Sequence, residues 1–366
     1  MENIEAVKNN TVIRNEMPRT DLTLSDFDYP LPEERIAQIP LEKRDHSRLM
    51  VLDRSDDSIT HKHFYDLCEY LRPNDVLVVN DSRVIPARIY GNAEGDENSR
   101  IELLLLRQAE NDTWECLAKP GKKAKIGRAF TFGNILRAEP VEVLEDGNRM
   151  MRFSYDKEKY DNLFAVLNEI GSMPLPPYIR EKLSDKERYQ TVYSNEEGSA
   201  AAPTAGLHFT EELLAKVKSM GVDVVPVMLH VGLGTFRPMK CENVNEHVMH
   251  TEYFSVSEKS AERINRARAE GGRVICVGTT SARTLESCTD EHGVVHAMSG
   301  DTGIFIYPGY TFRAVDALIT NFHLPKSTLL MLVSALYGRE KMLRAYDVAI
   351  KEEYRFFSFG DAMLIQ

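Results

Sequence analysis

The 366-residue sequence lacks several features that would assign it to particular classes of protein. No stretch approaches the roughly 20 apolar residues that cross a bilayer, and the first twenty residues lack the apolar core of a signal peptide. The five cysteines include no CxxC pair, which argues against a disulfide framework and against a structural zinc site. These absences predict a cytoplasmic globular protein with no membrane partner, in which residues 1–20 form a disordered extension.

Positive charge is also scarce, because the formal net charge is −11. This balance argues against a protein that coats nucleic acid without specificity, since phosphate contacts need local lysine and arginine. One basic cluster stands out, with Lys119, Lys122, Lys123, Lys125 and Arg128 around Pro120 and Gly121. From the residues alone, a solvated hairpin and a local anion-binding patch both remain open.

Seven short strand candidates follow one another between Asp75 and Phe153, separated by Gly, Asn and Asp turns. Strands at such regular spacing predict a small β-barrel or sandwich. Because helical patterns lie on both sides, we expect an insertion at 75–155 in a larger α/β domain made of 21–74 and 156–366. The strand candidates are 76–79, 84–90, 101–106, 114–118, 129–132, 141–144 and 150–153.

The stretch Ala202–Phe236 predicts a unit of loop, helix, strand and loop. Thr210 is placed to cap the helix, Gly221 to end it, and the β-branched run Val222–Val231 suits a strand covered on both faces. An apolar stripe at 160–170 predicts a further helix that Gly171 ends. Other expected helices are 257–269, 282–287, 328–337 and 340–354, and other expected strands are 49–53, 58–62, 274–277, 303–307 and 315–319.

Three of these strands are followed by polar residues where a plain turn needs only Gly or Asn. They end at His230–Phe236, Gly278–Thr280 and Thr320–His323. In open α/β sheets ligands bind beyond the carboxyl ends of the strands. We therefore expect the three ends to line one crevice.

Each signal has a structural alternative that the sequence leaves open. Gly232 and Gly234 suit either a ligand loop or a tight turn. Thr279 and Thr280 offer backbone N–H groups to an anion or simply begin a helix, with Arg283 one turn further on.

The titratable candidates are ambiguous in the same way. His208, His230, His250 and His323 lie in loops or at strand ends, where an imidazole acts as acid or base or is held structurally. His247, His250 and Glu252 lack a further ligand at a familiar spacing, so we expect no metal. Asp81 with Arg83 and Arg88 is either a ligand contact or a structural ion pair.

Taken together, the motifs resemble the S-adenosylmethionine:tRNA ribosyltransferase-isomerase family of queuosine biosynthesis. The resemblance runs from about Leu24 to the last residue. The segments that carry it are NDSRVIPAR (80–88), AKPGKK (118–123), APTAGLHF (202–209), LHVGLGTFRP (229–238), HTEYF (250–254), VGTTSARTLES (277–287) and TNFHLPKSTLLMLVSALYG (320–338).

The resemblance implies an α/β domain interrupted by a β-barrel, acting as a monomer on two substrates. S-adenosylmethionine, a substrate rather than a cofactor, gives its ribosyl part to the aminomethyl group of a 7-deazaguanine in a tRNA anticodon. The implied catalytic candidates are Asp81, His208, His230, His250, Glu252 and His323. The implied substrate contacts are Arg83, Arg88, Thr204, Gly206, Gly232, Gly234, Thr235, Phe236, Thr279, Thr280, Arg283 and Asn321, and the implied tRNA contacts are Lys119, Lys122 and Lys123.

Two rival functions remain at this point. One is a noncatalytic RNA-binding or nucleotide-sensing module, which would not need His, Thr and Asn at three strand ends. The other is a methyltransferase that uses S-adenosylmethionine. Such an enzyme is expected to have a Gly-rich loop after its first strand and an acidic ribose-binding residue beyond it, and this sequence lacks that pattern.

Overall fold

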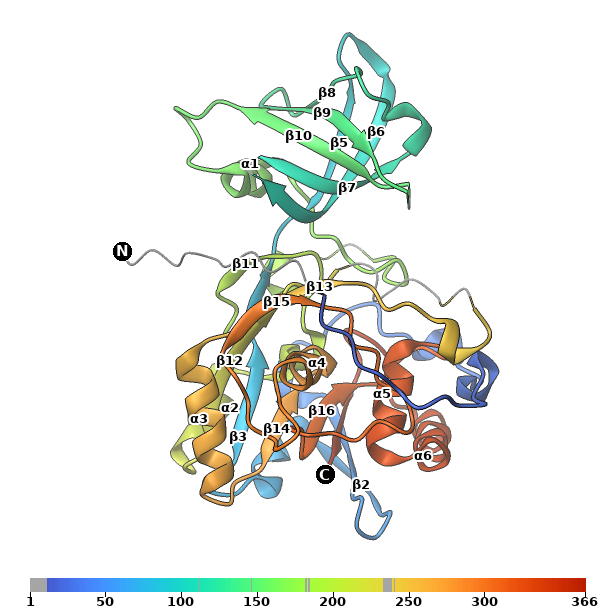
Figure 1. Ribbon diagram of the computed structural model, residues 1–366, viewed down its shortest axis with the longest axis vertical. Coiled ribbons are helices and arrows are strands. Elements are labelled where there is room, and N and C mark those ends of the chain that lie inside the picture. The colour runs from blue at the N-terminus through green and yellow to red at the C-terminus, as the bar shows by residue number, and fades with distance from the viewer. Residues whose placement is uncertain are drawn as a thin grey trace.

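The computed structural model describes residues 12–110, 112–145, 147–181, 183, 185–232, 239 and 241–366. Within these residues the chain forms a nine-stranded sheet flanked by helices and a separate closed barrel of six strands. Figure 1 shows the barrel beyond one edge of the sheet domain, joined to it by the chain segments around β4 (Ser82–Val84) and α1 (Leu163–Ile170). The expected combination of an α/β domain with an inserted β-barrel is confirmed.

The large sheet has the strand order β15-β13-β12-β3-β14-β16-β17-β1-β2. Its centre is parallel, because β3 pairs in parallel with both β12 and β14, and β14 pairs in parallel with β16. Its strands are β1 (Arg48–Leu52), β2 (Ile59–His63), β3 (Val76–Asn80), β12 (Asp223–Leu229), β13 (Glu252–Val256), β14 (Val274–Val277), β15 (Met298–Thr302), β16 (Ala317–Asn321) and β17 (Ala362–Ile365).

Both faces of this sheet are covered, and β3 shows how. Its side chains alternate, so that Val76 and Val78 pack in one apolar cluster while Leu77 and Val79 pack in another. Helices α3, α4, α5 and α6 contribute to the first cluster, and α2 with the 3-10 helix Phe64–Tyr70 contributes to the second. The helix bounds are α2 Glu211–Ser219, α3 Glu258–Ala269, α4 Thr279–Ser287, α5 Thr328–Tyr337 and α6 Arg339–Lys351.

The barrel closes in the order β10-β7-β6-β5-β8-β9 around its own apolar core, which includes the buried Trp114. Helix α1 (Leu163–Ile170) packs on this core, where Phe164 meets the Trp114 ring edge to face at 5.9 Å. The strands are β5 (Arg88–Ala93), β6 (Asp96–Glu110), β7 (Thr113–Lys119), β8 (Phe130–Phe132), β9 (Leu136–Val143) and β10 (Arg149–Tyr155), and a short sheet pairs β4 (Ser82–Val84) with β11 (Glu196–Ser199).

Several local predictions are confirmed. The Thr210 side chain accepts a hydrogen bond of 3.1 Å from the Leu213 backbone N–H and so caps α2, and Gly221 follows the helix with a φ of +80°. Helix α5 begins directly after Ser327, whose hydroxyl caps it. Both cases rest on short-range hydrogen bonds, which a sequence pattern specifies well.

Other predictions are wrong, and the reasons lie in long-range pairing. Residues 76–79, expected as the first barrel strand, form β3 at the centre of the large sheet, because an apolar run does not specify which sheet buries it. The helix at 163–170 packs on the barrel core and not on the α/β sheet. Residues 303–307, expected as a strand, form none, and the observed strand β15 lies just before them at Met298–Thr302. The sequence patterns also did not predict strands β13 and β17. How far the division at 75 and 155 defines separate domains stays a prediction.

Candidate functional site

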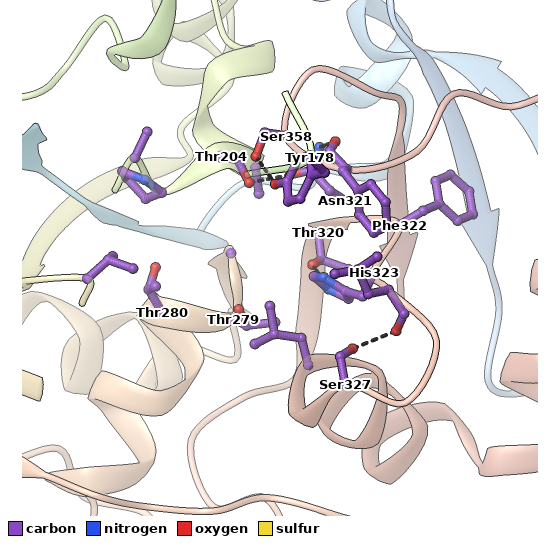
Figure 2. Close-up of a pocket in the computed structure, with 18 residues that line it drawn as sticks. Tyr178, Thr204, Thr279, Thr280, Thr320, Asn321, Phe322, His323, Ser327 and Ser358 are labelled. Carbon is purple, nitrogen blue, oxygen red and sulfur yellow. Dashed lines mark hydrogen bonds between the residues drawn. The ribbon is translucent and has the colours of Figure 1, made fainter. Parts of the chain in front are cut away.

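A pocket lies at the carboxyl ends of β12, β14 and β16 (Figure 2). Because these strands are linked in parallel through β3 and β14, their carboxyl ends reach the same edge of the sheet. The expected crevice is therefore formed in part: Val231, Gly278–Thr280 and Thr320–His323 line it, whereas His230 and Gly232 line a second hollow. Its polar lining consists of Tyr178, Thr204, Thr279, Thr280, Thr320, Asn321, His323, Ser327 and Ser358.

One wall of the pocket is set by hydrogen bonds that run behind it. The Thr204 hydroxyl donates to Asn321 Oδ1 at 3.0 Å, and Asn321 Nδ2 lies 3.0 Å from His208 Nε2. His208 Nδ1 in turn lies 2.7 Å from the hydroxyl of Ser47, which itself donates to the Arg44 carbonyl at 3.3 Å. This chain fixes how the Asn321 amide faces the pocket.

His208 and His323 are both buried and held. Burial lowers the pKa of each imidazole to about 3, so both are neutral at pH 7. His323 Nε2 lies 2.8 Å from the Thr320 hydroxyl, and its backbone N–H donates to the Tyr346 hydroxyl at 2.9 Å. This arrangement suits side chains that orient their neighbours.

The first turn of α4 forms the opposite wall (Figure 2). Gly278, with a φ of +89°, precedes the helix and provides no side-chain cap for it. The Thr280 hydroxyl is buried and has no hydrogen-bond partner among the described residues. The positive end of the helix dipole and an uncommitted hydroxyl therefore face the same pocket, which suits an anionic ligand.

A second, wider cleft lies between the barrel and the sheet domain. It adjoins the pocket at residues 230–232, where Val231 lines the pocket while His230 and Gly232 line the cleft. The barrel contributes Leu106, Arg107, Gln108, Trp114, Glu115 and Asn148, α1 contributes Phe164, and the sheet domain contributes Glu197, Gly198, His230, Gly232, His250, Thr251, Glu252 and Tyr253.

A buried ion pair supports the floor of the cleft. Glu252 Oε2 accepts a hydrogen bond from Arg283 Nη1, and both side chains are under 5% exposed. The second oxygen of Glu252 accepts the Gly232 backbone N–H at 2.9 Å. The pair therefore ties the chain after β12 to β13 and α4.

His230 differs from the other two buried histidines. Its ring lies beside Tyr253, with centroids 6.1 Å apart and planes 24° apart, and its buried Nδ1 has no hydrogen-bond partner among the described residues. Burial lowers its pKa. Gly198, at a φ of +138°, lies so close that an added Cβ would stand 2.7 Å from the ring. His230 is thus a neutral imidazole that lines the cleft and whose buried Nδ1 is uncommitted among the described residues.

Some residues expected in the site lie elsewhere. Asp81 lines neither hollow; burial, followed by the charge of Glu196, raises its pKa to about 6. Arg83 pairs with Glu187 at 2.6 Å, and Arg88 lies 3.5 Å from Glu102. Both arginines therefore take part in ion pairs outside the two hollows.

The remaining expected residues are accounted for as follows. Gly206 packs against the Tyr193 hydroxyl and lines neither hollow, although its neighbour Ala205 lines the pocket. Arg283 does not line the cleft itself but pairs with Glu252, which does. Three expected tRNA contacts lie on the barrel: Lys119, Lys122 and Lys123. Gly234, Thr235 and Phe236 lie outside the described residues.

Several lining residues of the two hollows carry no signal in the sequence. Tyr178 and Ser358 meet at the pocket through a hydrogen bond of 2.6 Å, although 180 positions separate them. Three prolines, Pro174, Pro176 and Pro177, precede Tyr178 in the sequence, and no pattern distinguishes Ser358 or Phe357. Gln108, Glu115 and Asn148 enter the cleft only because the barrel is placed against the sheet domain.

Metal-binding clusters and membrane-spanning helices are both absent from the described part of the chain. No group of three or more His, Cys, Asp or Glu side chains there could hold a metal ion. No helix there has the length and apolar composition to span a membrane.

Comparison with known proteins agrees with this geometry. Residues 24–365 match the family described as "Queuosine biosynthesis protein". The chain belongs to this family. Curated relatives named S-adenosylmethionine:tRNA ribosyltransferase-isomerase, from Acetivibrio thermocellus and Clostridium kluyveri, are each 58% identical over 347 residues, which is 94% of this chain and 100% of the relative.

A solved structure of a family member is also similar. It is an S-adenosylmethionine tRNA ribosyltransferase from Thermotoga maritima, 39% identical, with a TM-score of 0.53 over 93% of this chain and 100% of the other. The family resemblance inferred from seven sequence motifs is confirmed.

Proposed function

We propose that this chain is an S-adenosylmethionine:tRNA ribosyltransferase-isomerase. It transfers the ribosyl part of S-adenosylmethionine to the aminomethyl group of a 7-deazaguanine in tRNA and isomerises it to epoxyqueuosine, with release of adenine and methionine. One observation carries the assignment: a polar pocket and a wider cleft adjoin at residues 230–232. A reaction between a small molecule and a base of a large RNA needs two such adjoining sites.

We assign S-adenosylmethionine to the pocket. The first turn of α4 suits the methionine carboxylate, because the helix N-terminus and the Thr280 hydroxyl offer donors there. The rings of Tyr178 and Phe357, with centroids 4.8 Å apart, offer aromatic faces to the sulfonium. Thr204 and Asn321 provide polar contacts for the rest of the ligand.

We assign the deazaguanine to the cleft, with His230 as the base. An alkyl ammonium has a pKa near that of lysine, about 10, so it must lose a proton before its nitrogen attacks. Burial in the cleft lowers that pKa, and neutral His230 has a free nitrogen to accept the proton. His250 and Glu252 line the same cleft, and Glu197 adds an exposed carboxylate.

The test is a single incubation with S-adenosylmethionine and tRNA that carries the aminomethyl-deazaguanine. We expect free adenine and methionine. S-adenosylhomocysteine instead would identify a methyltransferase, and binding without turnover would identify an RNA-binding module.

Variants of the cleft test the placement of the chemistry. His230→Gln is expected to lower kcat by roughly 10²- to 10⁴-fold, the usual contribution of a general base. Should the His230→Gln, His250→Gln and Glu252→Gln variants all fold and keep near-wild-type adenine release, the acid and base groups lie elsewhere, with Asp81 the next candidate.

The localisation, the oligomeric state and the tRNA-binding surface are also part of the proposal. We propose that the protein acts in the cytoplasm and as a monomer. Light scattering coupled to gel filtration tests the monomer.

Lys119, Lys122 and Lys123 are proposed to contact tRNA phosphates, so neutralising Lys122 and Lys123 should flatten the salt dependence of tRNA binding.

A further inference from the structure

A groove on the outer surface of the barrel is separate from both hollows of the proposed active site. The pairing of β5 with β6 and of β6 with β7 sets Tyr90, Glu102 and Lys119 side by side across three strands. The residues that line the groove are Tyr90, Gly91, Asn92, Arg100, Ile101, Glu102, Lys119 and Pro120.

Tyr90 is an exposed aromatic side chain that the fold does not use. It is 58% exposed, whereas its neighbour Ile89 is fully buried in the barrel core. A Cβ on Gly91 would stand 2.2 Å from the Thr131 carbonyl oxygen, so β5 fits tightly against β8 and Tyr90 stands on the outer face. Its ring has no aromatic contact or hydrogen bond among the described residues, which leaves one face open to a ligand.

The cations around Tyr90 are also uncommitted. Arg100 and Lys119 line the groove with it, and neither has a carboxylate within ion-pair distance among the described residues. Several other cations of the barrel and the segment after it are paired with carboxylates, as in Arg107–Asp301, Arg137–Glu139 and Lys157–Asp112. The carboxylate inside the groove, Glu102, lies 3.5 Å from Arg88. The groove is thus locally positive on a chain with a net charge of −11.

We propose that this groove binds an unpaired nucleotide of the tRNA, with its base stacked on Tyr90 and its phosphates held by Arg100 and Lys119. Exposed aromatic rings beside cations are how proteins bind single-stranded nucleic acid. Asn92 adds an amide side chain to the lining, a group that both donates and accepts hydrogen bonds with base edges. The identity of the RNA rests on the proposed function.

The position of the groove fits this occupant. Strand β6 carries Arg100 and Glu102 in the groove and Leu106 and Gln108 in the cleft. Leu106 lies four positions after Glu102 on the strand, about 13 Å at 3.3 Å per residue. A few unpaired nucleotides cover that distance, so the groove holds the RNA close to the modified base. An acidic peptide would use the cations but has no planar group for Tyr90.

The experiment measures binding of a labelled, unmodified anticodon stem–loop to the full chain, without S-adenosylmethionine. Tyr90→Ala is expected to weaken binding about 5- to 100-fold, whereas Tyr90→Phe keeps the stacking face and binds like the wild type. Lys119→Gln is expected to lower the salt slope by about 0.7, the effect of one lost phosphate contact. Tyr65→Ala is the matched control, because Tyr65 is 39% exposed on the sheet domain.

A fluorescent reporter distinguishes a nucleotide from other anions. In Tyr90→Trp, the stem–loop is expected to quench the added indole, whereas polyphosphate and a glutamate-rich peptide leave it unchanged. Equal quenching by the peptide, or unchanged stem–loop binding by Tyr90→Ala, would overturn the proposal.

The outcome is independent of whether the proposed reaction occurs. Loss of binding in Tyr90→Ala together with no adenine release from the wild type would support the groove and contradict the function. If the wild type releases adenine normally and Tyr90→Ala changes neither the binding nor the KM for tRNA, the function would be supported and the groove proposal contradicted.

Discussion

Nε2 of His208 accepts a hydrogen bond from Nδ2 of Asn321 at 3.0 Å. Since the amide nitrogen can only donate, the proton of the neutral imidazole sits on Nδ1, which donates to Ser47. The Asn321 oxygen is then left to accept the Thr204 hydroxyl. His208 is therefore a positioning residue, and the pocket wall depends on a side chain that does not line it.

His208→Ala is expected to lower kcat/KM for S-adenosylmethionine by roughly tenfold, the effect of about one lost hydrogen bond. The pH profile of kcat should stay as in the wild type, because His208 transfers no proton. Ser47→Ala should also lower kcat/KM for S-adenosylmethionine, but by less than His208→Ala. His296→Ala, at an exposed surface histidine, is the control; a shifted pH profile in His208→Ala would instead mark His208 as an acid or base.

Acid should destabilise the protein through its two most buried histidines. The pKa of both His208 and His323 is lowered to about 3, against about 6.5 in the unfolded chain. The unfolded state therefore binds more protons below pH 6.5, and stability present above that pH is lost as the pH falls toward 3. From pH 7 to pH 5 we expect each histidine to cost about 2 kcal/mol of unfolding free energy.

Urea unfolding at a series of pH values checks this expectation. His323→Asn should flatten the pH dependence between pH 7 and pH 5, even though it lowers stability at pH 7. Asp81 acts in the opposite direction, because its pKa is raised to about 6, so Asp81→Asn should steepen the loss in acid. A wild-type midpoint that does not change over this range would contradict the buried, neutral histidines.

The ion pair between Glu252 and Arg283 should be strongly coupled. Removing one partner leaves the other charged and buried, which typically costs about 3–5 kcal/mol. Glu252→Gln and Arg283→Leu are each expected to destabilise the chain by that order, and the double variant should lose less than the sum of the two. Chemical unfolding of all four proteins gives the coupling, with Lys351→Ala, which removes an exposed pair, as a control. Additive losses would show that the pair is not coupled.

Gly198 should be intolerant of any side chain. Gly198→Ala is disfavoured by its φ of +138° and places a Cβ 2.7 Å from the His230 ring. Because the ring must move, we expect kcat to fall at least tenfold while S-adenosylmethionine binding, measured by calorimetry, changes little. Gly147→Ala provides the comparison: it also has positive φ, but its added Cβ has no heavy atom within 4 Å. Equal activity of the two variants would count against a role for His230.

The sequence predicts best what short-range chemistry decides. The helix capped by Thr210, the helix that follows Ser327 and the polar ends of three parallel strands all follow from spacing and hydrogen-bonding types. What it misses depends on contacts between distant segments. Val76–Asn80 is an apolar run that fits any sheet, and only its pairing with β12 and β14 places it.

The same limit applies to the site. The sequence gives no reason to assign different roles to His208 and His230, and only their surroundings in the fold distinguish them. His208 is held by Ser47 and Asn321, whereas the buried Nδ1 of His230 has no hydrogen-bond partner among the described residues. The cleft residues of the barrel could not be predicted, because nothing local tells on which side of the barrel the sheet domain lies.

Strand β17 has a consequence for synthesis of the chain. It lies between β16 and β1, so one of the earliest strands to be made has a neighbour that is translated roughly 310 residues later. At about 5–20 residues per second, β1 waits on the order of 15–60 s for that neighbour. The barrel has all its strands long before then. On the ribosome, the barrel is thus able to fold first, while the apolar edge of β1 stays open to chaperones until the sheet closes.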